Sequence, residues 1–321
     1  MPETLDFEEP IAPLLKELDD LLALPRTDSA QREIDTLEKK IETLRASVYA
    51  SLTPWQLVQV ARHPNRPGFE SFLGLIFEGF VEVHGDRRFA DDHAIMTGFA
   101  EYKGQPVLVV GHVKGVDTKE KIFRNFGYAR PEGYRKALRT MRLAEKFSRP
   151  IIVFIDTPAA YPGIESEERG VAEAIAVNLR EMMLLDTPIV IIVSGEGGSG
   201  GALGIAVGDR VLMQEFAIYS VIPPEGCAAI LWRDANKKVE ASAALKLTAP
   251  DLLKAGIIDH IIPEPIGGAH TDPAAAAALV TTVLDEVLAE ISALDSAARL
   301  ERRYGKFRNM GRLGIDFVDE G

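Results

Sequence analysis

The fold of this chain is decided by residues 188–206, which read PIVIIVSGEGGSGGALGIA. Five β-branched residues follow Pro188, and such runs are typical of strands buried on both faces of a parallel sheet. A glycine-rich loop follows at 195–201, and the small residues of 202–206 predict a helix that packs closely on the sheet. This order of strand, glycine loop and helix indicates an α/β fold.

The same order occurs once more, directly upstream. Residues 151–156 (IIVFID) predict a second buried strand, and a loop at 156–163 (DTPAAYPG) leads into a predicted helix at 165–185. Further segments extend the pattern: a hairpin of strands at 94–100 and 106–112 around the turn Lys103-Gly104, a helix at 131–147, and strands near Val211 and at 257–262.

The two ends of the chain read as helical. Leucine and isoleucine spacing over residues 1–50 predicts a helical hairpin that breaks at Pro25, and residues 68–83 predict another helix. A long alanine-rich helix is predicted at 273–294, and the residues from Arg299 onward read as peripheral. We therefore divide the chain into a helical N-terminal region (1–90), a main domain (91–295) and a peripheral C-terminal tail (296–321).

Composition excludes several classes of protein. The 321 residues are 46% hydrophobic and 26% charged, as in ordinary globular proteins. A net charge of −12 makes the chain as a whole a poor nucleic-acid binder. The single cysteine, Cys227, can form neither an internal disulfide nor a thiolate zinc cage, which fits a reducing compartment. Without a signal peptide pattern or an apolar run near the ~20 residues that span a bilayer, we expect a cytoplasmic protein away from membranes.

Charge is unevenly distributed along the chain. Between Lys114 and Arg149 there are eleven basic and four acidic residues, a local balance of +7 in an acidic protein. Such a stretch favours a multiply anionic ligand or an acidic partner surface, while a solvated helix face is an equally open interpretation.

The two loops at 156–163 and 195–201 are the candidates for chemistry. Both follow the carboxyl ends of buried strands, where ligands bind in α/β folds. The second loop enters a helix, whose first N–H groups are unpaired and carry partial positive charge. Together these features suit the stabilisation of a developing oxyanion. For one such loop alone, close packing of helix on sheet is the favoured explanation of the small residues, but two loops at adjacent strand ends favour a site.

Other motifs give weaker predictions. Residues 197–201 match the G-x-S-x-G elbow of serine hydrolases, with Asp259, His260 and His270 as possible partners. Gly195, Gly197 and Gly200 spell a dinucleotide-binding pattern, but too late in the chain for the usual position. The sequence contains no phosphate-binding P-loop and no histidine spacing typical of a metal site. Cys227 is best interpreted as a buried structural thiol.

Several longer segments carry a family resemblance. They are 111–121 (GHVKGVDTKEK), 124–127 (RNFG), 131–139 (PEGYRKALR), 154–158 (FIDTP), 160–163 (AYPG), 167–170 (EERG), 195–201 (GEGGSGG), 219–222 (YSVI), 224–227 (PEGC), 230–232 (ILW), 262–265 (IPEP) and 267–270 (GGAH). In this order, from about residue 5 to 295, the chain resembles the α subunits of the bacterial acetyl-CoA carboxylase carboxyltransferase. One departure is Ala159, where the family usually has glycine.

The resemblance implies a crotonase-like α/β fold, a superhelix of ββα turns with a helical N-terminal extension and a C-terminal helix. It implies an α2β2 assembly whose β chain carries a zinc finger, and no metal or covalent cofactor on this chain. The implied reaction moves a carboxyl group from carboxybiotin, borne by a biotin carboxyl carrier protein, to acetyl-CoA. The product is malonyl-CoA, the committed precursor of fatty-acid biosynthesis, while a separate biotin carboxylase uses the ATP.

The resemblance also implies roles for individual residues. The backbone N–H groups of Gly200 and Gly201 would form the oxyanion hole for the biotin carbonyl, with Gly163 as a further catalytic position, and the β chain would bind the thioester. The implied substrate-binding residues are Tyr161, Gly197, Gly198, Ser199, Lys119, Lys121 and Arg135. Two other classes stay open: another crotonase-fold enzyme, such as a hydratase or a propionyl-type carboxyltransferase, and a non-catalytic scaffold of the same fold.

Overall fold

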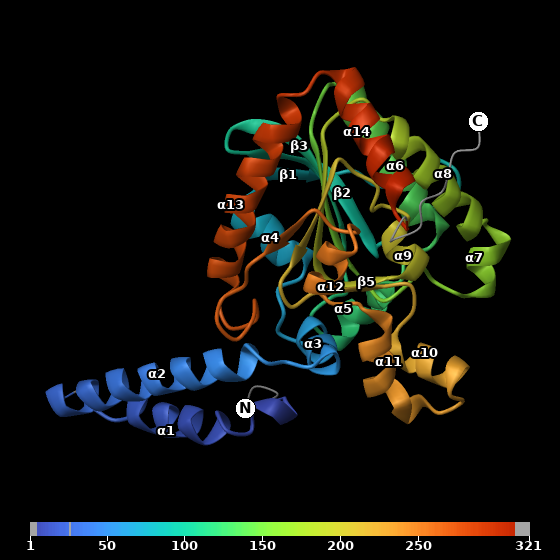
Figure 1. Ribbon diagram of the computed structural model, residues 1–321. Helices are drawn as coiled ribbons and strands as arrows, with labels where there is room; N and C mark the ends of the chain where they lie inside the picture. Colours follow the sequence, from blue (N-terminus) through green and yellow to red (C-terminus); the bar gives the residue numbers. More distant parts are fainter. Residues whose placement is uncertain (1–4, 26, 312–321) are drawn as a thin grey trace.

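An eight-stranded sheet organises the computed structural model, which describes residues 5–25 and 27–311 (Figure 1). The order across the sheet is β1-β2-β3-β4-β5-β6-β8, and the short β7 pairs with the far end of β5. The strands are β1 Glu78–Glu82, β2 Ile95–Tyr102, β3 Gln105–His112, β4 Ile151–Thr157, β5 Ile189–Gly198, β6 Arg210–Gln214, β7 Ile218–Ser220 and β8 His260–Ile262. The predicted hairpin is confirmed, since β2 and β3 pair antiparallel around Lys103 and Gly104, and the strands from β3 to β8 run parallel.

Helices cover both faces of this sheet. The described residues form α1 Ala12–Leu22, α2 Asp28–Tyr49, α3 Pro54–Ala61, α4 Phe69–Ile76, α5 Thr118–Phe123, α6 Pro131–Lys146, α7 Ile164–Glu168, α8 Val171–Leu184, α9 Ser199–Leu203, α10 Pro224–Leu231, α11 Lys238–Leu245, α12 Ala249–Lys254, α13 Pro273–Ser292 and α14 Ser296–Asn309, with 3-10 turns at Asp6–Glu8, Asn125–Gly127 and Ala235–Lys237. The ribbon shows α4 and α13 on one side of the strands, and α6, α8 and α14 on the other (Figure 1).

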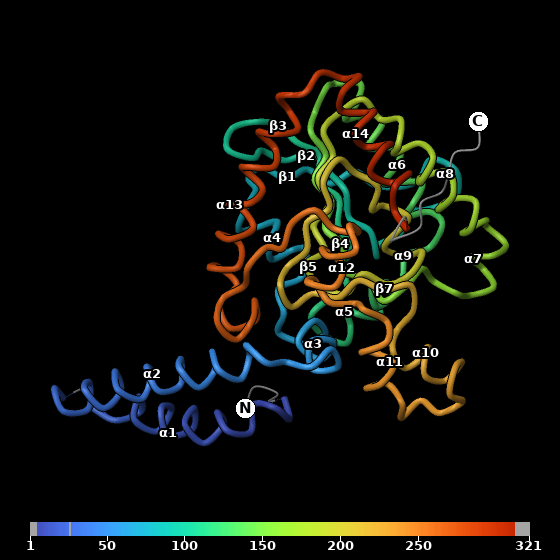
Figure 2. The backbone as a smooth tube through the Cα atoms, in the orientation of Figure 1, coloured from blue at the N-terminus to red at the C-terminus, as the bar shows by residue number. Residues whose placement is uncertain are grey.

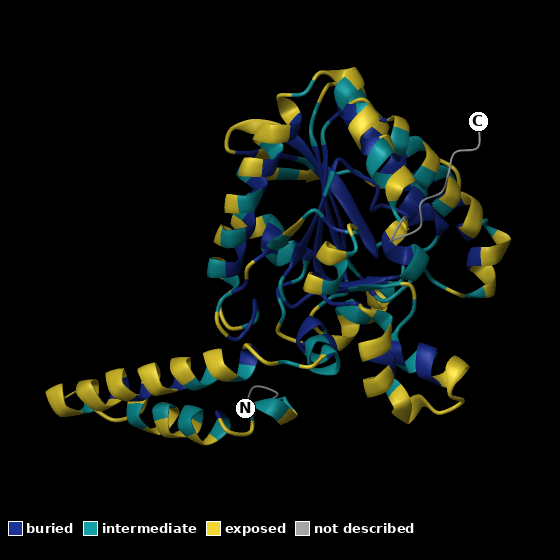
Figure 3. Ribbon diagram, in the orientation of Figure 1, coloured by how far each residue is buried: buried dark blue, intermediate teal, exposed yellow. Residues whose placement is uncertain are grey.

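Alternation along β4 and β5 explains why both strands read as unbroken apolar runs. Ile151, Val153 and Ile155 contribute to the core under α6 and α8, while Ile152 and Phe154 face the core under α4 and α13. Because successive side chains of a strand point to opposite faces, two cores require apolar residues at every position. In Figure 3 these central strands are uniformly buried.

The N-terminal helical hairpin is confirmed. α1 and α2 pack through a small apolar cluster that includes Ile11, Leu37 and Ile41, and Pro25 lies in the connection between them. The hairpin projects away from the sheet, and its outer faces are exposed (Figures 1 and 3).

Two predicted helices are wrong in their extent. The helix expected over 68–83 ends at Ile76, and residues 78–82 instead form β1, which pairs with the open edge of β2. The helix expected over 165–185 is interrupted at Gly170, whose φ of 76° lies in the left-handed region that glycine tolerates best. β1 thus joins a segment of the predicted N-terminal region to the main sheet, and the three-part division of the chain remains a prediction.

The interpretation of the residues from Arg299 onward as peripheral is wrong for α14. Arg303 is only 1% exposed, and its guanidinium forms a bidentate pair with Asp209, with both contacts at 2.8 Å. Its other donors reach the carbonyls of Met182, Leu185 and Thr187, so all five N–H groups have acceptors. A charged side chain suggests the surface in a sequence, but a fully satisfied arginine can be buried. Residues 312–321 of the predicted tail lie outside the described residues.

Candidate active site

The end of the sheet where β4 and β5 finish carries the residues predicted to act in chemistry. We call residues 156–163 and 195–201 together the glycine edge, and the backbone trace follows β4 and β5 side by side to it (Figure 2). Strand β5 continues to Gly198, so the predicted loop at 195–201 is strand up to this point and helix α9 from Ser199. Gly197 pairs with Thr157 of β4 on one side and with Tyr219 of β7 on the other, which explains why the segment stays extended.

Most glycines of this edge are required by packing. A Cβ on Gly198 would overlap the Pro158 carbonyl oxygen, and one on Gly201 would overlap the backbone of Ala159 and Ala160. A Cβ on Gly197 would lie 2.7 Å from the Tyr219 ring. Close packing, the simpler of the two interpretations of the sequence, therefore holds at these positions, although the contacts are with the first loop and the Tyr219 ring and not between a helix and the sheet.

Gly200 differs from its neighbours. A Cβ on this residue would meet only Ile175 Cδ1, at 3.6 Å, and the residue is half-buried. It lies in the first turn of α9, where backbone N–H groups have no acceptor within the helix. The backbone at Gly200 can therefore be approached closely by a ligand while its N–H remains available as a donor.

Helix α9 is held from behind by buried polar contacts. The Asn178 side-chain amide donates to the carbonyls of Gly204 and Tyr134, each at 2.9 Å. A Cβ on Gly204 would lie 2.7 Å from the Tyr134 ring, so helix and ring are in close contact. These contacts fix the end of α9 and with it the direction of its first N–H groups.

Asp156 positions the turn of β5 into the glycine edge. Ile155 pairs with Val193 and Thr157 with Gly197, so Asp156 stands opposite three residues of β5 and the ladder bulges. The Asp156 carboxylate accepts the Glu196 N–H at 2.9 Å, and it fills the space that a Cβ on Gly195 would need. This explains why Gly195 must be glycine.

A chain of ion pairs surrounds this carboxylate. Lys114, just after β3, lies 2.6 Å from Asp156 and 3.6 Å from Glu196. Arg62 then pairs with Glu196 at 2.5 Å and with Glu225 of α10 at 2.8 Å. Burial would lower the pKa of Arg62, but Glu196 and Glu225 raise it overall. Because each charge faces an opposite charge, these groups suit positioning better than proton transfer.

No individual role was predicted for these charged residues, although Asp156 and Glu196 stand in the two predicted loops. Asp156 ends the predicted strand at 151–156, and Lys114 comes two residues after the predicted strand at 106–112, so those positions were the available signal. Arg62 and Glu225 come from segments far away in the chain, which no spacing pattern relates to the glycine edge.

Tyr161 and Gly163 lie together in the first loop. The Tyr161 N–H donates to the Ala129 carbonyl at 2.9 Å, and the Arg130 guanidinium stacks over its ring at 5.0 Å. A Cβ on Gly163 would overlap this ring, so the two positions are shaped by each other. Ala159, the departure from the family pattern, has no positive φ, and alanine therefore fits the backbone there.

The predicted basic residues are not brought together. A cleft of about 170 Å³ beside the glycine edge is lined by Lys121 together with Arg62, Lys114 and Asp156. Lys119 is exposed on α5, whereas Arg135 lies on α6 at a different pocket, where it is paired with Asp86 and Glu132.

One geometric feature of Ser199 supports the alternative of a serine nucleophile, and another feature that this alternative needs is missing. Ser199 has a φ of 47°, as a strained strand-to-helix turn requires. Its hydroxyl, however, has no hydrogen-bond partner within the described residues. His260 is exposed on β8, and His270 stacks on His63 with ring centroids 3.9 Å apart.

Two further side chains near the site are buried. Burial lowers the pKa of His112 to about 4, and neither of its ring nitrogens has a partner among the described residues, although the backbone of Gly201 and Phe154 lies beside the ring. Cys227 is buried in α10 against Ala228 and Ala241, which confirms the interpretation as a buried thiol. The described part of the chain holds no cluster of three or more metal-ligating side chains.

Comparison with known proteins decides the family. The family model described as "Acetyl co-enzyme A carboxylase carboxyltransferase-like" matches residues 4–311. The chain belongs to this family. It is 55% identical to the "Acetyl-coenzyme A carboxylase carboxyl transferase subunit alpha" of Geobacter metallireducens over 96% of this chain and 98% of that protein. The protein of the same name from Geobacter sulfurreducens is 58% identical over 86% of each chain.

Solved structures agree on the fold. The transcarboxylase 12S core superposes with a TM-score of 0.56 at 19% identity, over 70% of this chain and 42% of that one. A Pseudomonas malonate decarboxylase hetero-tetramer in complex with coenzyme A gives a TM-score of 0.56 at 19% identity, over 68% of this chain and 87% of that one. These structures confirm the expected crotonase-like fold, and the family match over residues 4–311 confirms the expected class of carboxyltransferase.

One further expectation concerns membranes. Within residues 5–25 and 27–311, no helix is both long and apolar enough to cross a bilayer.

Proposed function

We propose that this chain is one half of an acetyl-CoA carboxyltransferase, which accepts the carboxyl group of carboxybiotin and delivers it to acetyl-CoA to give malonyl-CoA. Family membership over residues 4–311 and the names of the relatives support this reaction. The observation that carries the proposal is the open, half-buried backbone at Gly200, set in an edge whose other glycines are tightly packed.

The role of this chain would be to hold the biotin carbonyl. The N–H groups of Gly200 and Gly201, at the start of α9, are the donors we propose for the negative charge that develops on that oxygen. Gly163 and Tyr161 would shape the opposite wall, and Gly197, Gly198 and Ser199 would set the direction of the turn. Fixed N–H donors suit this task because they need no reorganisation when charge develops.

The partly buried ion pairs would keep this geometry in place. Asp156 holds the bulge through the Glu196 N–H, and Lys114 neutralises it at 2.6 Å. The first α9 turn therefore starts from a strand fixed on both sides. Lys121 lines the neighbouring cleft, where it would bind an anionic substrate. Lys119 would act from its exposed position on α5, and Arg135 from its separate pocket.

The remaining parts of the reaction would come from other chains. We propose a β subunit that binds the CoA thioester and carries zinc, in an α2β2 assembly, together with a biotin carboxyl carrier protein and a biotin carboxylase. No covalent cofactor is needed on this chain, and we expect the assembly in the cytoplasm. The heteromeric malonate decarboxylase and the names of the relatives support a subunit that works in a complex.

Co-expression with the β subunit tests the proposal. Malonyl-CoA decarboxylation with free biotin as acceptor should be catalysed by the complex and not by either chain alone. The same rate from this chain alone would contradict the shared site, and an inactive but well-formed complex would favour a scaffold.

A further inference from the structure

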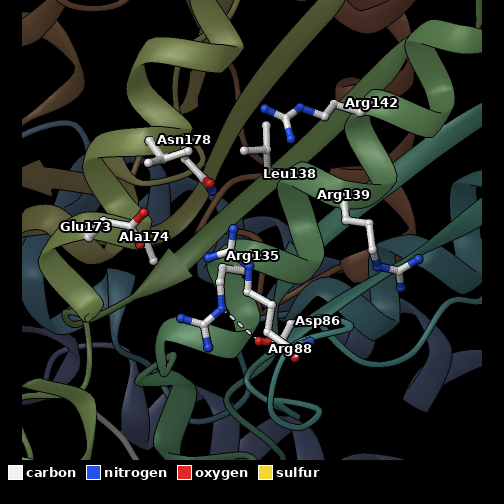
Figure 4. A pocket seen from close by; sticks show the side chains of 10 residues that line it. Asp86, Arg88, Arg135, Leu138, Arg139, Arg142, Glu173, Ala174 and Asn178 are labelled. Atoms are coloured by element: carbon white, nitrogen blue, oxygen red, sulfur yellow. Dashed lines mark hydrogen bonds and ion pairs between the residues drawn. The ribbon is translucent and has the colours of Figure 1, made fainter. Parts of the chain in front are cut away.

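A second pocket lies on the outer helical layer, between α6, α8 and the loop before β2. It has a volume of about 320 Å³, and four arginines line it: Arg88, Arg135, Arg139 and Arg142 (Figure 4). The volume is at the lower end of the range for small-molecule sites. We call it the arginine pocket.

The charges of this pocket are only partly neutralised. Arg135 is bound by Asp86 and Glu132, and Arg142 pairs with Glu181 at 2.7 Å. Arg88 has no ion pair among the described residues. Arginines outnumber carboxylates in the lining by four to two, so the pocket presents an excess of positive charge in a protein of net charge −12.

Arg139 adds to this excess. Its guanidinium donates to two backbone carbonyls, of His84 and Gly85, at 2.8–3.2 Å, and it pairs with no carboxylate. Burial and the nearby Arg87 lower the pKa of Arg139. Glu173, exposed on α8, is the remaining carboxylate of the lining and forms no ion pair in the described structure.

The loop that carries Arg88 is ordered in advance. Asp86 accepts the N–H groups of Arg88, Phe89 and Ala90 at 2.8–3.2 Å and also binds Arg135. Both carboxylate oxygens of Asp86 are thus occupied, one by the N–H groups of the loop and the other by Arg135. A binding site whose backbone is already fixed loses less entropy when a ligand binds.

One neutral group of the lining points to a ligand as well. Asn178 is 1% exposed, and its Oδ1 has no hydrogen-bond partner among the described residues. Buried polar atoms are almost always hydrogen-bonded, so an acceptor left open in a pocket fits a donor group on a bound molecule. The amide nitrogen of the same side chain already holds the Gly204 carbonyl behind α9.

We propose that the arginine pocket binds a small molecule that bears a diphosphate group and a hydroxyl or amino donor. Arg88 binds the phosphates, since a planar guanidinium group matches phosphate oxygens with paired hydrogen bonds, and Arg139 contributes its positive charge and its remaining Nη1 donors. Asn178 Oδ1 accepts from the donor group. The pocket shares no lining residue with the cleft beside the glycine edge, so this is a separate site on the chain.

Titration calorimetry with inorganic pyrophosphate tests the site, using the full chain in complex with its co-expressed β subunit. The wild type should bind pyrophosphate, and Arg88→Ala should weaken binding about tenfold, as the loss of a charge-assisted contact does. Arg88 makes no contact that the fold needs. Arg302→Ala removes an exposed arginine of α14 outside the pocket and serves as the matched control, with unchanged affinity.

A second arm separates the sources of the diphosphate. ADP and CoA both carry this group, and each is titrated against pyrophosphate already bound to the complex. Competition by CoA together with a raised KM for acetyl-CoA in Arg88→Ala would assign the site to the substrate, and competition by ADP alone would assign it to a separate ligand.

Three results would overturn the proposal. They are no pyrophosphate binding by the wild type, equal affinities of the wild type and Arg88→Ala, or loss of the β subunit from Arg88→Ala at unchanged anion affinity. The last result would identify the pocket as part of a protein interface. None of these results bears on decarboxylation by the wild-type complex, so the proposed function is tested independently.

Discussion

The glycine edge and the arginine pocket place charge in opposite ways. At the glycine edge the charged side chains are paired with one another, from Lys114 through Asp156 and Glu196 to Arg62. What remains accessible there is the backbone at Gly200. At the arginine pocket, by contrast, Asp86 accepts the backbone N–H groups of the loop, and some side-chain charges have no partner of opposite charge.

This difference predicts which kind of substitution each region tolerates. A backbone site depends on close packing, so substitutions that add atoms there should have large effects that do not change with salt concentration. A side-chain site depends on charge, so its effects should be smaller and screened by salt. Substitutions in the two regions can break or sharpen this contrast.

The largest effect is expected from Gly198→Ala. Its Cβ would overlap the Pro158 carbonyl oxygen, a backbone atom that cannot move without shifting β4. We expect a loss of about 4 kcal/mol or more in the free energy of unfolding, measured by denaturant titration. Gly200→Ala is the matched control, because its Cβ has room, and it should lose less than about 1 kcal/mol. Equal losses would show that the edge is not packed as described.

Arg135→Ala should have the next largest effect. It leaves the buried Asp86 carboxylate without its counter-charge, whereas Glu132 keeps Arg169 at 2.8 Å, and breaking a buried pair costs about 3 kcal/mol. Arg142→Ala is the control on the same helix. It removes the half-exposed partner of Glu181 and should leave the melting temperature unchanged. If both variants melt like the wild type, Arg135 is free for ligand binding and the pocket holds more open charge than we describe.

His112 should give the glycine edge a pH dependence. Its pKa falls from 6.5 in the unfolded chain to about 4 in the folded protein, so the unfolded state binds more protons between these values. Stability present above pH 6.5 is therefore lost as the pH falls toward 4, by about 2 kcal/mol at pH 5. The difference in unfolding free energy between wild type and His112→Gln should follow this curve, and a flat difference would contradict it.

Asp156→Asn should act more on turnover than on stability. Asparagine keeps an acceptor for the Glu196 N–H but leaves Lys114 without its nearest counter-charge. We expect a loss of about 1 kcal/mol in stability and about a tenfold lower kcat with little change in KM. Glu168→Gln, on the exposed side of α7, should match the wild type in both measurements. A change in KM alone would assign Asp156 to substrate binding.

The sheet and its neighbours were largely predictable from the sequence. The β-branched runs at 151–156 and 188–193 predicted β4 and β5, because strands between two helical layers must be apolar at every position. The end of α4 was not predictable in the same way, since Phe77 to Val83 satisfies either element until the open edge of β2 is known. Gly170 gave a local signal for the helix break that periodicity over 165–185 obscured.

The sequence predicted where the glycine edge lies, but not the geometry of its individual residues. The clustered glycines indicated close approach, but the sequence could not tell Gly198, which must fit against Pro158, from Gly200, which has room. Lys114, Asp156 and Arg62 were missed because contacts between distant segments leave no spacing pattern. Arg303 was missed for a related reason: its burial depends on carbonyls from three other positions and on Asp209.

One pair of variants tests the central claim that open backbone, and not a side chain, serves the reaction at this edge. Malonyl-CoA decarboxylation by the complex is measured for Gly200→Val and Ser199→Ala, with unfolding followed in parallel. The structure predicts about a 100-fold loss for Gly200→Val at nearly unchanged stability, since the branched side chain fills the approach to the N–H donors, and less than a tenfold loss for Ser199→Ala. The reverse ranking, or a covalent adduct on Ser199, would contradict the account.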